Sequence, residues 1–155
     1  MERKTIIALC WIVDLLNQKN IRYQITGGFA AKLYGSPRDL YDLDIDIDAN
    51  NFNQLLPFVD PYIISGPQRY KDDSFAVWLL SLCYHGQLID LSLSQNARIF
   101  NKTTKKWEDS PTNFDQSNIV NFGQQRFNVI PKDELIIYKK IIGRPTDLID
   151  VQNIS

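Results

Sequence analysis

The chain has 155 residues, roughly the size of one domain, and 44% of them are hydrophobic while 23% are charged. This composition is ordinary for a globular protein and excludes a disordered or low-complexity chain. The 17 Lys and Arg residues against 18 Asp and Glu residues give a net charge of −1, so no overall positive field attracts nucleic acid or an anionic membrane. We therefore expect one domain over residues 1–155, in which any recognition of anions is local.

Membrane and secretory segments are not expected. The longest apolar run, residues 6–13, is far shorter than the ~20 residues that a bilayer-spanning helix needs, and no cleavage site for a signal peptide follows it. Cys10 and Cys83 both lie among apolar neighbours, as free buried thiols do, and two cysteines with the single histidine cannot form a zinc site alone. These features predict a cytoplasmic protein without a membrane partner.

The first half of the chain alternates between helical and strand periodicity. The patterns predict a helix over residues 3–18, a strand over 21–25, a helix over 29–34, a strand over 40–49 and a helix over 50–59. A glycine turn, Gly27-Gly28, separates the first strand from the helix after it, and Gly35-Ser36-Pro37 ends that helix.

The second half predicts mainly hairpins and two closing helices. The patterns predict a brief strand over residues 62–64, a loop over 65–73, strands over 75–84 and 87–93, a hairpin over 120–129, and helices over 131–143 and 144–151. His85-Gly86 and Gly123-Gln124 are the expected hairpin turns, with Val120 near Phe127, and residues 94–116 carry no clear pattern. This mixed order predicts an α+β domain with a mixed β-sheet flanked by helices.

One segment is unusually acidic. Five of the acidic residues fall within ten positions, with no Lys or Arg among them: Asp39, Asp42, Asp44, Asp46 and Asp48. Aspartates that alternate along a strand share one face about 7 Å apart, where like charges repel and burial is costly. Two interpretations are open: a solvated edge strand whose charges block pairing, or a divalent metal site, since Mg²⁺ prefers carboxylate oxygens.

The glycine pair adds a second element. Gly27-Gly28 follows a strand and precedes a helix, where backbone without side chains can approach phosphate oxygens. A plain tight turn is the alternative. The spacing from this pair to the aspartates is more informative than either feature alone.

That spacing resembles a known family. Gly27-Gly28, a thirteen-residue stretch and then Asp42-Leu43-Asp44-Ile45 resemble the nucleotidyltransferase superfamily of DNA polymerase β type. Gly35-Ser36-Pro37-Arg38 and the closing residues 142–150 look like the small stand-alone members related to aminoglycoside and lincosamide adenylyltransferases. The resemblance implies a glycine turn for the triphosphate and two metal-binding aspartates, with a third carboxylate on a later strand.

Asp90 is the expected third carboxylate, because it is a single acid within an otherwise apolar strand; an isolated aspartate is the alternative. Asp44 with Asp46 is a second possible register for the metal pair, but the spacing from Gly28 favours Asp42 with Asp44. The resemblance thus implies that Asp42, Asp44 and Asp90 are the catalytic and metal-binding residues.

The implied reaction is Mg²⁺-dependent transfer of a nucleoside monophosphate from a nucleoside triphosphate, with ATP expected, to an acceptor hydroxyl, an activity of EC 2.7.7 type with two metal ions. Gly27, Gly28, Arg38 and Lys139 are the expected nucleotide-binding residues; Arg69, Lys71 and Arg144 are further candidate phosphate partners, and a surface cation is the alternative for each.

The acceptor is left open between a small molecule, a protein and an RNA end. No long helical segment that would build an acceptor pocket follows within the sequence, so a homodimer that completes the cleft is also open. The competing hypothesis is a catalytically silent fold that serves as a binding or toxin–antitoxin module. A nucleic-acid-binding module is disfavoured, because Lys102, Lys105 and Lys106 are too few and too local.

Overall fold

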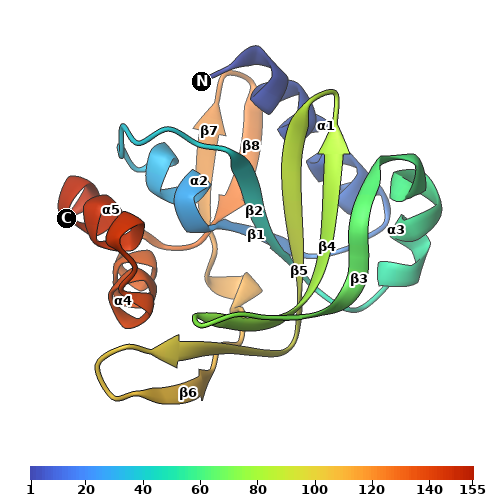
Figure 1. Ribbon diagram of the computed structural model, residues 1–155. Helices are drawn as coiled ribbons and strands as arrows, with labels where there is room; N and C mark the ends of the chain where they lie inside the picture. Colours follow the sequence, from blue (N-terminus) through green and yellow to red (C-terminus); the bar gives the residue numbers. More distant parts are fainter.

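The computed structural model describes residues 1–155 and contains one mixed eight-stranded sheet with five α-helices (Figure 1). Neighbouring strands follow the order β3-β4-β5-β2-β1-β8-β7, and β6 pairs with β5 outside this path. The strands are β1 (Tyr23–Thr26), β2 (Asp42–Ile47), β3 (Ile63–Lys71), β4 (Phe75–Tyr84), β5 (Gln87–Asn101), β6 (Lys106–Asp109), β7 (Asn118–Phe122) and β8 (Gln125–Val129). The helices are α1 (Arg3–Gln18), α2 (Gly27–Leu33), α3 (Phe52–Val59), α4 (Lys132–Ile142) and α5 (Pro145–Ile154). Single 3₁₀ turns, η1 (Asp60–Tyr62) and η2 (Phe114–Gln116), precede β3 and β7.

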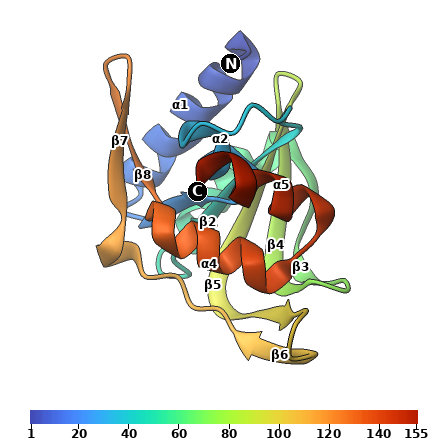
Figure 2. The ribbon, with the colours of Figure 1, turned by 90° about the vertical axis from the view of Figure 1, so that its left-hand side faces the viewer.

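Helices cover both faces of the sheet. In Figure 1, α1 and α3 lie to one side of the strands, while α4 and α5 lie to the other; Figure 2 shows α4 and α5 in front of the sheet, next to α2. The alternation along β2 sorts its side chains between the two faces. Leu43, Ile45 and Ile47 are fully buried in the hydrophobic core, and the aspartates between them face α4 and α5. The predicted α+β fold is therefore confirmed.

Both predicted hairpins are present. β4 and β5 are joined by His85-Gly86, where both residues have positive φ, and β7 and β8 are joined across Gly123-Gln124 with Val120 opposite Phe127. Such turns need left-handed backbone, which glycine adopts without steric cost.

Two segments differ from the sequence-based expectation. β3 continues through residues 65–71, where a loop was predicted, and β5 continues to Asn101 and pairs with β6 inside the segment without a pattern. The register between β4 and β5 jumps from the pair Trp78–Leu93 to the pair Ala76–Arg98, so residues 94–97 form a bulge in β5. A bulge breaks the two-residue alternation and bends the strand, which hides it from pattern analysis. The bent end of β5 and β6 form an arm below α4 (Figures 1 and 2).

No helix in the structure combines the length and the hydropathy that crossing a lipid bilayer requires. This agrees with the short apolar runs of the sequence.

Candidate active site

Three carboxylates meet on the face of the sheet that α4 and α5 cover. Asp42 and Asp44 lie on β2, and the parallel pairing of β2 with β5 places Asp90 directly beside Asp44. One carboxylate oxygen from each of the three lies within 4.8 Å of the corresponding oxygens of the other two. The sequence therefore located all three members of this carboxylate triad (Asp42, Asp44 and Asp90), and the tertiary structure brings them together.

Mutual repulsion and burial make the triad electrostatically unfavourable without a counter-charge. Burial raises the pKa of Asp44 well above its usual value, and the neighbouring charges of Asp42 and Asp90 raise it further. Burial and a hydrogen bond with Asp90 also raise the pKa of Asp42. Ser81 donates a hydrogen bond to one oxygen of Asp90 at 2.6 Å, which fixes that carboxylate. A divalent cation would supply the missing counter-charge, and hard carboxylate oxygens fit Mg²⁺.

The glycine pair lies against the triad, and the structure makes Gly27 and Gly28 the first two residues of α2, where the sequence predicted a separate turn before the helix. Antiparallel pairing of β1 with β2 sets Thr26 opposite Asp44, so Gly27 begins α2 beside the Asp44 carboxylate. Gly27 has a φ of +64°, and a Cβ there would collide with the Asp44 side chain. A Cβ on Gly28 would lie 2.6 Å from Nη2 of Arg38. Both glycines thus allow close approach of side chains that line the site.

The other aspartates of the acidic segment lie outside the triad. Asp46 is one step further along β2 and accepts a hydrogen bond from the Thr112 hydroxyl at 2.9 Å. Burial raises the pKa of Asp46 to about 6. Asp48 forms an ion pair with Arg22 at 2.7 Å, and Asp39 is exposed in the loop before β2.

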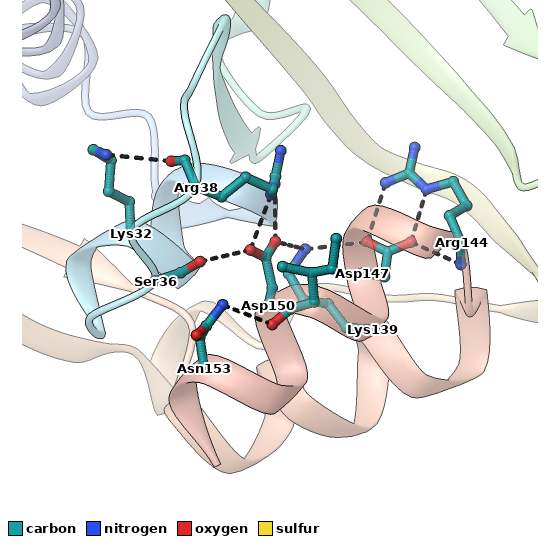
Figure 3. Close-up of polar contacts among 9 residues, drawn as sticks. Lys32, Ser36, Arg38, Lys139, Arg144, Asp147, Asp150 and Asn153 are labelled. Atoms are coloured by element: carbon teal, nitrogen blue, oxygen red, sulfur yellow. Dashed lines mark hydrogen bonds and ion pairs between the residues drawn. The ribbon is translucent and has the colours of Figure 1, made fainter.

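Arg38 and Lys139 meet in a network of ion pairs behind the glycine turn, drawn in Figure 3. Arg38 contacts Asp150 through Nε at 3.0 Å and Nη2 at 2.8 Å. Lys139 is almost fully buried, and its Nζ lies 3.1 Å from Asp147 and 2.9 Å from Asp150. The Lys139 ammonium is therefore neutralised by two carboxylates, whereas the Arg38 side chain is 26% exposed.

The remaining candidate cations are distributed unevenly. Arg144 lines the same cavity as the triad and forms a two-point ion pair with Asp147, with Nε and Nη2 at 2.7 and 3.2 Å. The Lys71 ammonium lies over the Trp107 ring, 5.0 Å from its centroid, and Arg69 is exposed on β3. Neither Arg69 nor Lys71 lines the cavity. Of these three, only Arg144 is placed beside the site.

A cavity of about 460 Å³ encloses the triad between the sheet and the α4–α5 pair. This volume lies within the range of small-ligand sites. Its polar part contains the triad, Gly27, Gly28 and Arg38, together with Asp46, Ser92, Ser94, Thr112 and Tyr138. Its other part is an apolar wall, defined by Tyr70, Phe75, Val77 and Leu79 of β3 and β4.

Sequence analysis missed several residues of this site. Ser81 and Thr112 gave no signal, because isolated hydroxyl residues are common and Thr112 follows the irregular segment. Asp150 was part of the closing motif but had no assigned role. Its two-point contact with Arg38 joins residues 112 positions apart, and only the fold reveals it.

Comparison with solved structures identifies the fold. No protein-family model matches the sequence, and no curated protein matches it. A Thermotoga maritima protein assigned as a nucleotidyltransferase superposes with a TM-score of 0.75 at 18% identity, over 93% of this chain and 88% of that chain. For the lincosamide antibiotic adenylyltransferase LnuA with lincomycin bound, the TM-score is 0.61 at 17% identity, over 94% and 93% of the two chains. For ANT(2″)-Ia in complex with adenylyl-2″-tobramycin, the TM-score is 0.56 at 13% identity, over 97% of this chain and 90% of that chain. The expected resemblance is confirmed at the level of the fold.

Proposed function

From the nucleotidyltransferase fold of this chain, we propose that the protein is a Mg²⁺-dependent nucleotidyltransferase that uses ATP or another nucleoside triphosphate. The observation that carries this proposal is the carboxylate triad on β2 and β5, set against the glycine turn in one cavity. The edge-strand interpretation of the aspartates loses its basis, because β2 pairs with β1 on one side and β5 on the other.

The triad suits a divalent cation. Asp42, Asp44 and Asp90 provide only hard oxygen donors, and the raised pKa values of Asp42 and Asp44 mark a site that gains from a positive charge. When bound there, magnesium, as one ion or a pair, would offset charge on the phosphoryl oxygens and promote ionisation of the acceptor hydroxyl.

The phosphate tail of the nucleotide is assigned to the glycine turn. Gly27 and Gly28 expose backbone beside Asp44, and the Arg38 guanidinium lies against Gly28 with part of its surface open to the cavity. Charge-assisted hydrogen bonds from a guanidinium are well suited to phosphate oxygens. Lys139 lies beneath this region, and its charge is neutralised by Asp147 and Asp150, so it supports the phosphate site by holding these carboxylates in place.

In the proposed reaction the acceptor oxygen attacks the α-phosphorus. A bond forms between these two atoms while the bond from the α-phosphorus to the bridging oxygen breaks, and pyrophosphate leaves with that electron pair. Asp90 accepts the hydroxyl proton, and Ser81 holds the Asp90 carboxylate in position. Arg38 stabilises the charge that develops on the leaving pyrophosphate.

The acceptor is assigned to the apolar wall. Across the cavity floor, Asp46 lies beside Ser92 and Ser92 beside Leu79, so the surface changes from polar to apolar between β5 and β4. A small hydroxyl compound with an apolar face would bury that face against the wall and direct its hydroxyl toward the triad. The lincomycin-bound and adenylyl-tobramycin-bound structures that share the fold support a small-molecule acceptor.

Binding of Mg²⁺ and nucleotide tests the proposal. Each of the four nucleoside triphosphates is titrated into the protein with Mg²⁺ or with EDTA, by calorimetry and by thermal shift. We expect Mg²⁺-dependent binding, which Asp42→Asn or Asp44→Asn removes. Asp48→Asn is the matched control, because it changes an aspartate of the same segment that pairs with Arg22 outside the cavity. Wild-type protein that binds none of the four nucleotides would favour the silent binding module instead.

Turnover is tested separately. Wild-type protein, Mg²⁺ and the bound nucleotide are incubated with pools of hydroxyl compounds, and released pyrophosphate and the adduct mass are measured. Asp90→Asn should retain part of the nucleotide affinity and lose pyrophosphate release, since Asp90 is the proposed proton acceptor. Undiminished release by Asp90→Asn would remove it from the mechanism.

A further inference from the structure

We propose that Asp150 is a positioning residue that holds the Arg38 guanidinium over the Gly28 turn, where it binds the two phosphates that leave as pyrophosphate. This inference rests on the proposed function and adds a residue to it. Figure 3 shows the arrangement: Asp150 extends from α5 to meet Arg38, which precedes β2.

Arg38 is held by one edge and open along the other. Its Nε and Nη2 each donate one hydrogen bond to a different oxygen of Asp150, at N···O distances of 3.0 and 2.8 Å. A guanidinium has five N–H donors, so this pairing leaves three for a ligand. The side chain lines the cavity, and its Nη2 would lie 2.6 Å from a Cβ on Gly28, so a larger residue at this position would displace the guanidinium from where it lies. The free donors are thus placed beside the proposed phosphate site.

Asp150 is itself fixed from several sides. Its side chain is fully buried, and beyond Arg38 it accepts a hydrogen bond from the Ser36 hydroxyl at 2.8 Å and contacts Lys139 Nζ at 2.9 Å. Lys139 also contacts Asp147, which ties α4 to α5. A carboxylate held by three partners has little freedom to rotate. The guanidinium that pairs with this carboxylate is restricted in the same way. Lys139 therefore acts on the phosphate site through Asp150.

Charge alone does not explain this arrangement. The ion-pair network contains three cations and two carboxylates: Arg38, Lys139 and Arg144, and Asp147 and Asp150. Removing the charge of Asp150 would make this region more positive and, by simple Coulomb attraction, favour a polyphosphate. If Asp150 instead orients Arg38, the same change weakens polyphosphate binding. The two roles therefore predict effects of opposite sign.

The first experiment uses that difference in sign. The affinities of the 155-residue wild-type chain, Asp150→Asn, Arg38→Gln and the double variant are measured by calorimetry for inorganic tripolyphosphate and for AMP, each with Mg²⁺. We expect Asp150→Asn and Arg38→Gln each to weaken tripolyphosphate binding roughly 10- to 100-fold, the range for losing a hydrogen bond to a charged group. The double variant should be no weaker than Arg38→Gln alone. AMP, which lacks the leaving phosphates, should bind each variant within about twofold of its wild-type affinity.

A second variant covers the case in which Asp150→Asn does not fold. Arg38→Lys keeps the positive charge at a partly exposed position but loses the planar, two-point pairing with Asp150. A drop in tripolyphosphate affinity of about tenfold supports the inference, and an affinity within twofold of wild type overturns it. Asp14→Asn, which changes an exposed aspartate on α1, is the matched control.

The outcomes separate this inference from the proposed function. Tighter or unchanged tripolyphosphate binding by Asp150→Asn overturns the positioning role while Mg²⁺-dependent nucleotide binding by the wild type still stands. The positioning role is also overturned if the loss of tripolyphosphate affinity in the double variant equals the product of the losses in the two single variants, because Asp150 would then act independently of Arg38. Wild-type protein that binds neither nucleotide nor tripolyphosphate overturns both.

Discussion

Asp44 and Asp90 lie directly opposite each other in the parallel pairing of β2 with β5, with Asp42 one step away on the same face. Parallel neighbours keep their side chains in register on a shared face, so two strands that are distant in the chain form one carboxylate cluster. Without a bound cation the cluster lowers the stability of the folded protein, because three carboxylates share one small region and repel one another. This cost gives the first prediction.

Asp44→Asn should stabilise the metal-free protein. The substitution removes a buried charge from the triad and keeps the shape of the side chain, so we expect the Tm in EDTA to rise by about 2–4 °C, which corresponds to roughly 1 kcal/mol for a domain of this size. The same variant should lose the rise in Tm that Mg²⁺ with nucleotide gives the wild type. Differential scanning fluorimetry with and without Mg²⁺ measures both effects. A lower Tm in EDTA would contradict the proposed repulsion.

Gly27→Ala should disturb the site more than backbone strain explains. A Cβ at this position collides with the Asp44 carboxylate, in addition to the cost of a φ of +64°. Gly123→Ala is the matched control, since Gly123 has a φ of +61° and no atom within 4 Å of the added Cβ. We expect both variants to lose about 1 kcal/mol of unfolding free energy from the backbone, and Gly27→Ala to lose at least tenfold in Mg²⁺-nucleotide affinity. Equal nucleotide affinity in the two variants would show that Gly27 does not shape the site.

Asp46→Asn distinguishes the two possible metal pairs, Asp42 with Asp44 and Asp44 with Asp46. Asp46 lies outside the triad and accepts a hydrogen bond from Thr112, which an asparagine oxygen can also accept. We therefore expect Asp46→Asn to keep Mg²⁺-dependent nucleotide binding within a few-fold of wild type, and Asp42→Asn to lose it. Calorimetric titration of both variants measures the difference. The reverse result would make Asp44 with Asp46 the metal pair.

Asp150 should make the protein sensitive to acid. Hydrogen bonds from Arg38, Lys139 and Ser36 outweigh burial and lower the pKa of Asp150 from 3.8 to about 2. A carboxyl group whose pKa is lower in the folded protein than in the unfolded chain stabilises the fold. This stabilisation is complete at pH values above the pKa of the unfolded chain, and it is lost as the pH falls through the pKa of the folded protein. The contribution, on the order of 2 kcal/mol, should therefore be present above about pH 4 and disappear toward pH 2.

Urea unfolding at several pH values measures this contribution. The stability difference between wild type and Asp150→Asn should shrink steadily as the pH falls from 4 toward 2. Asp14→Asn, at an exposed position with no ion pair, should differ little from wild type throughout. A difference for Asp150→Asn that is constant across this window would rule out the ion-pair network as its origin.

The sequence by itself determined most of the local elements, apart from the outer part of β3, the end of β5 and β6, and it proposed the three carboxylates of the site. The alternation of aspartate with apolar residues in β2 indicated the strand and its two faces. The resemblance to the nucleotidyltransferase superfamily, through the spacing from Gly27-Gly28, favoured Asp42 with Asp44 as the metal pair. The single acid in β5 gave Asp90. The strands and their faces depend on near neighbours in the chain, and backbone periodicity makes them visible without a structure, whereas the roles expected of the three aspartates came from the family resemblance.

The tertiary structure decided which of these residues meet. Only the strand order places Asp90 beside Asp44, and only the packing of α5 against the segment before β2 gives Arg38 its partner Asp150. The same packing buries Lys139 between two carboxylates, which its helical position did not indicate. Periodicity specifies which face a side chain occupies, whereas the partners on that face depend on long-range pairing of the strands and helices.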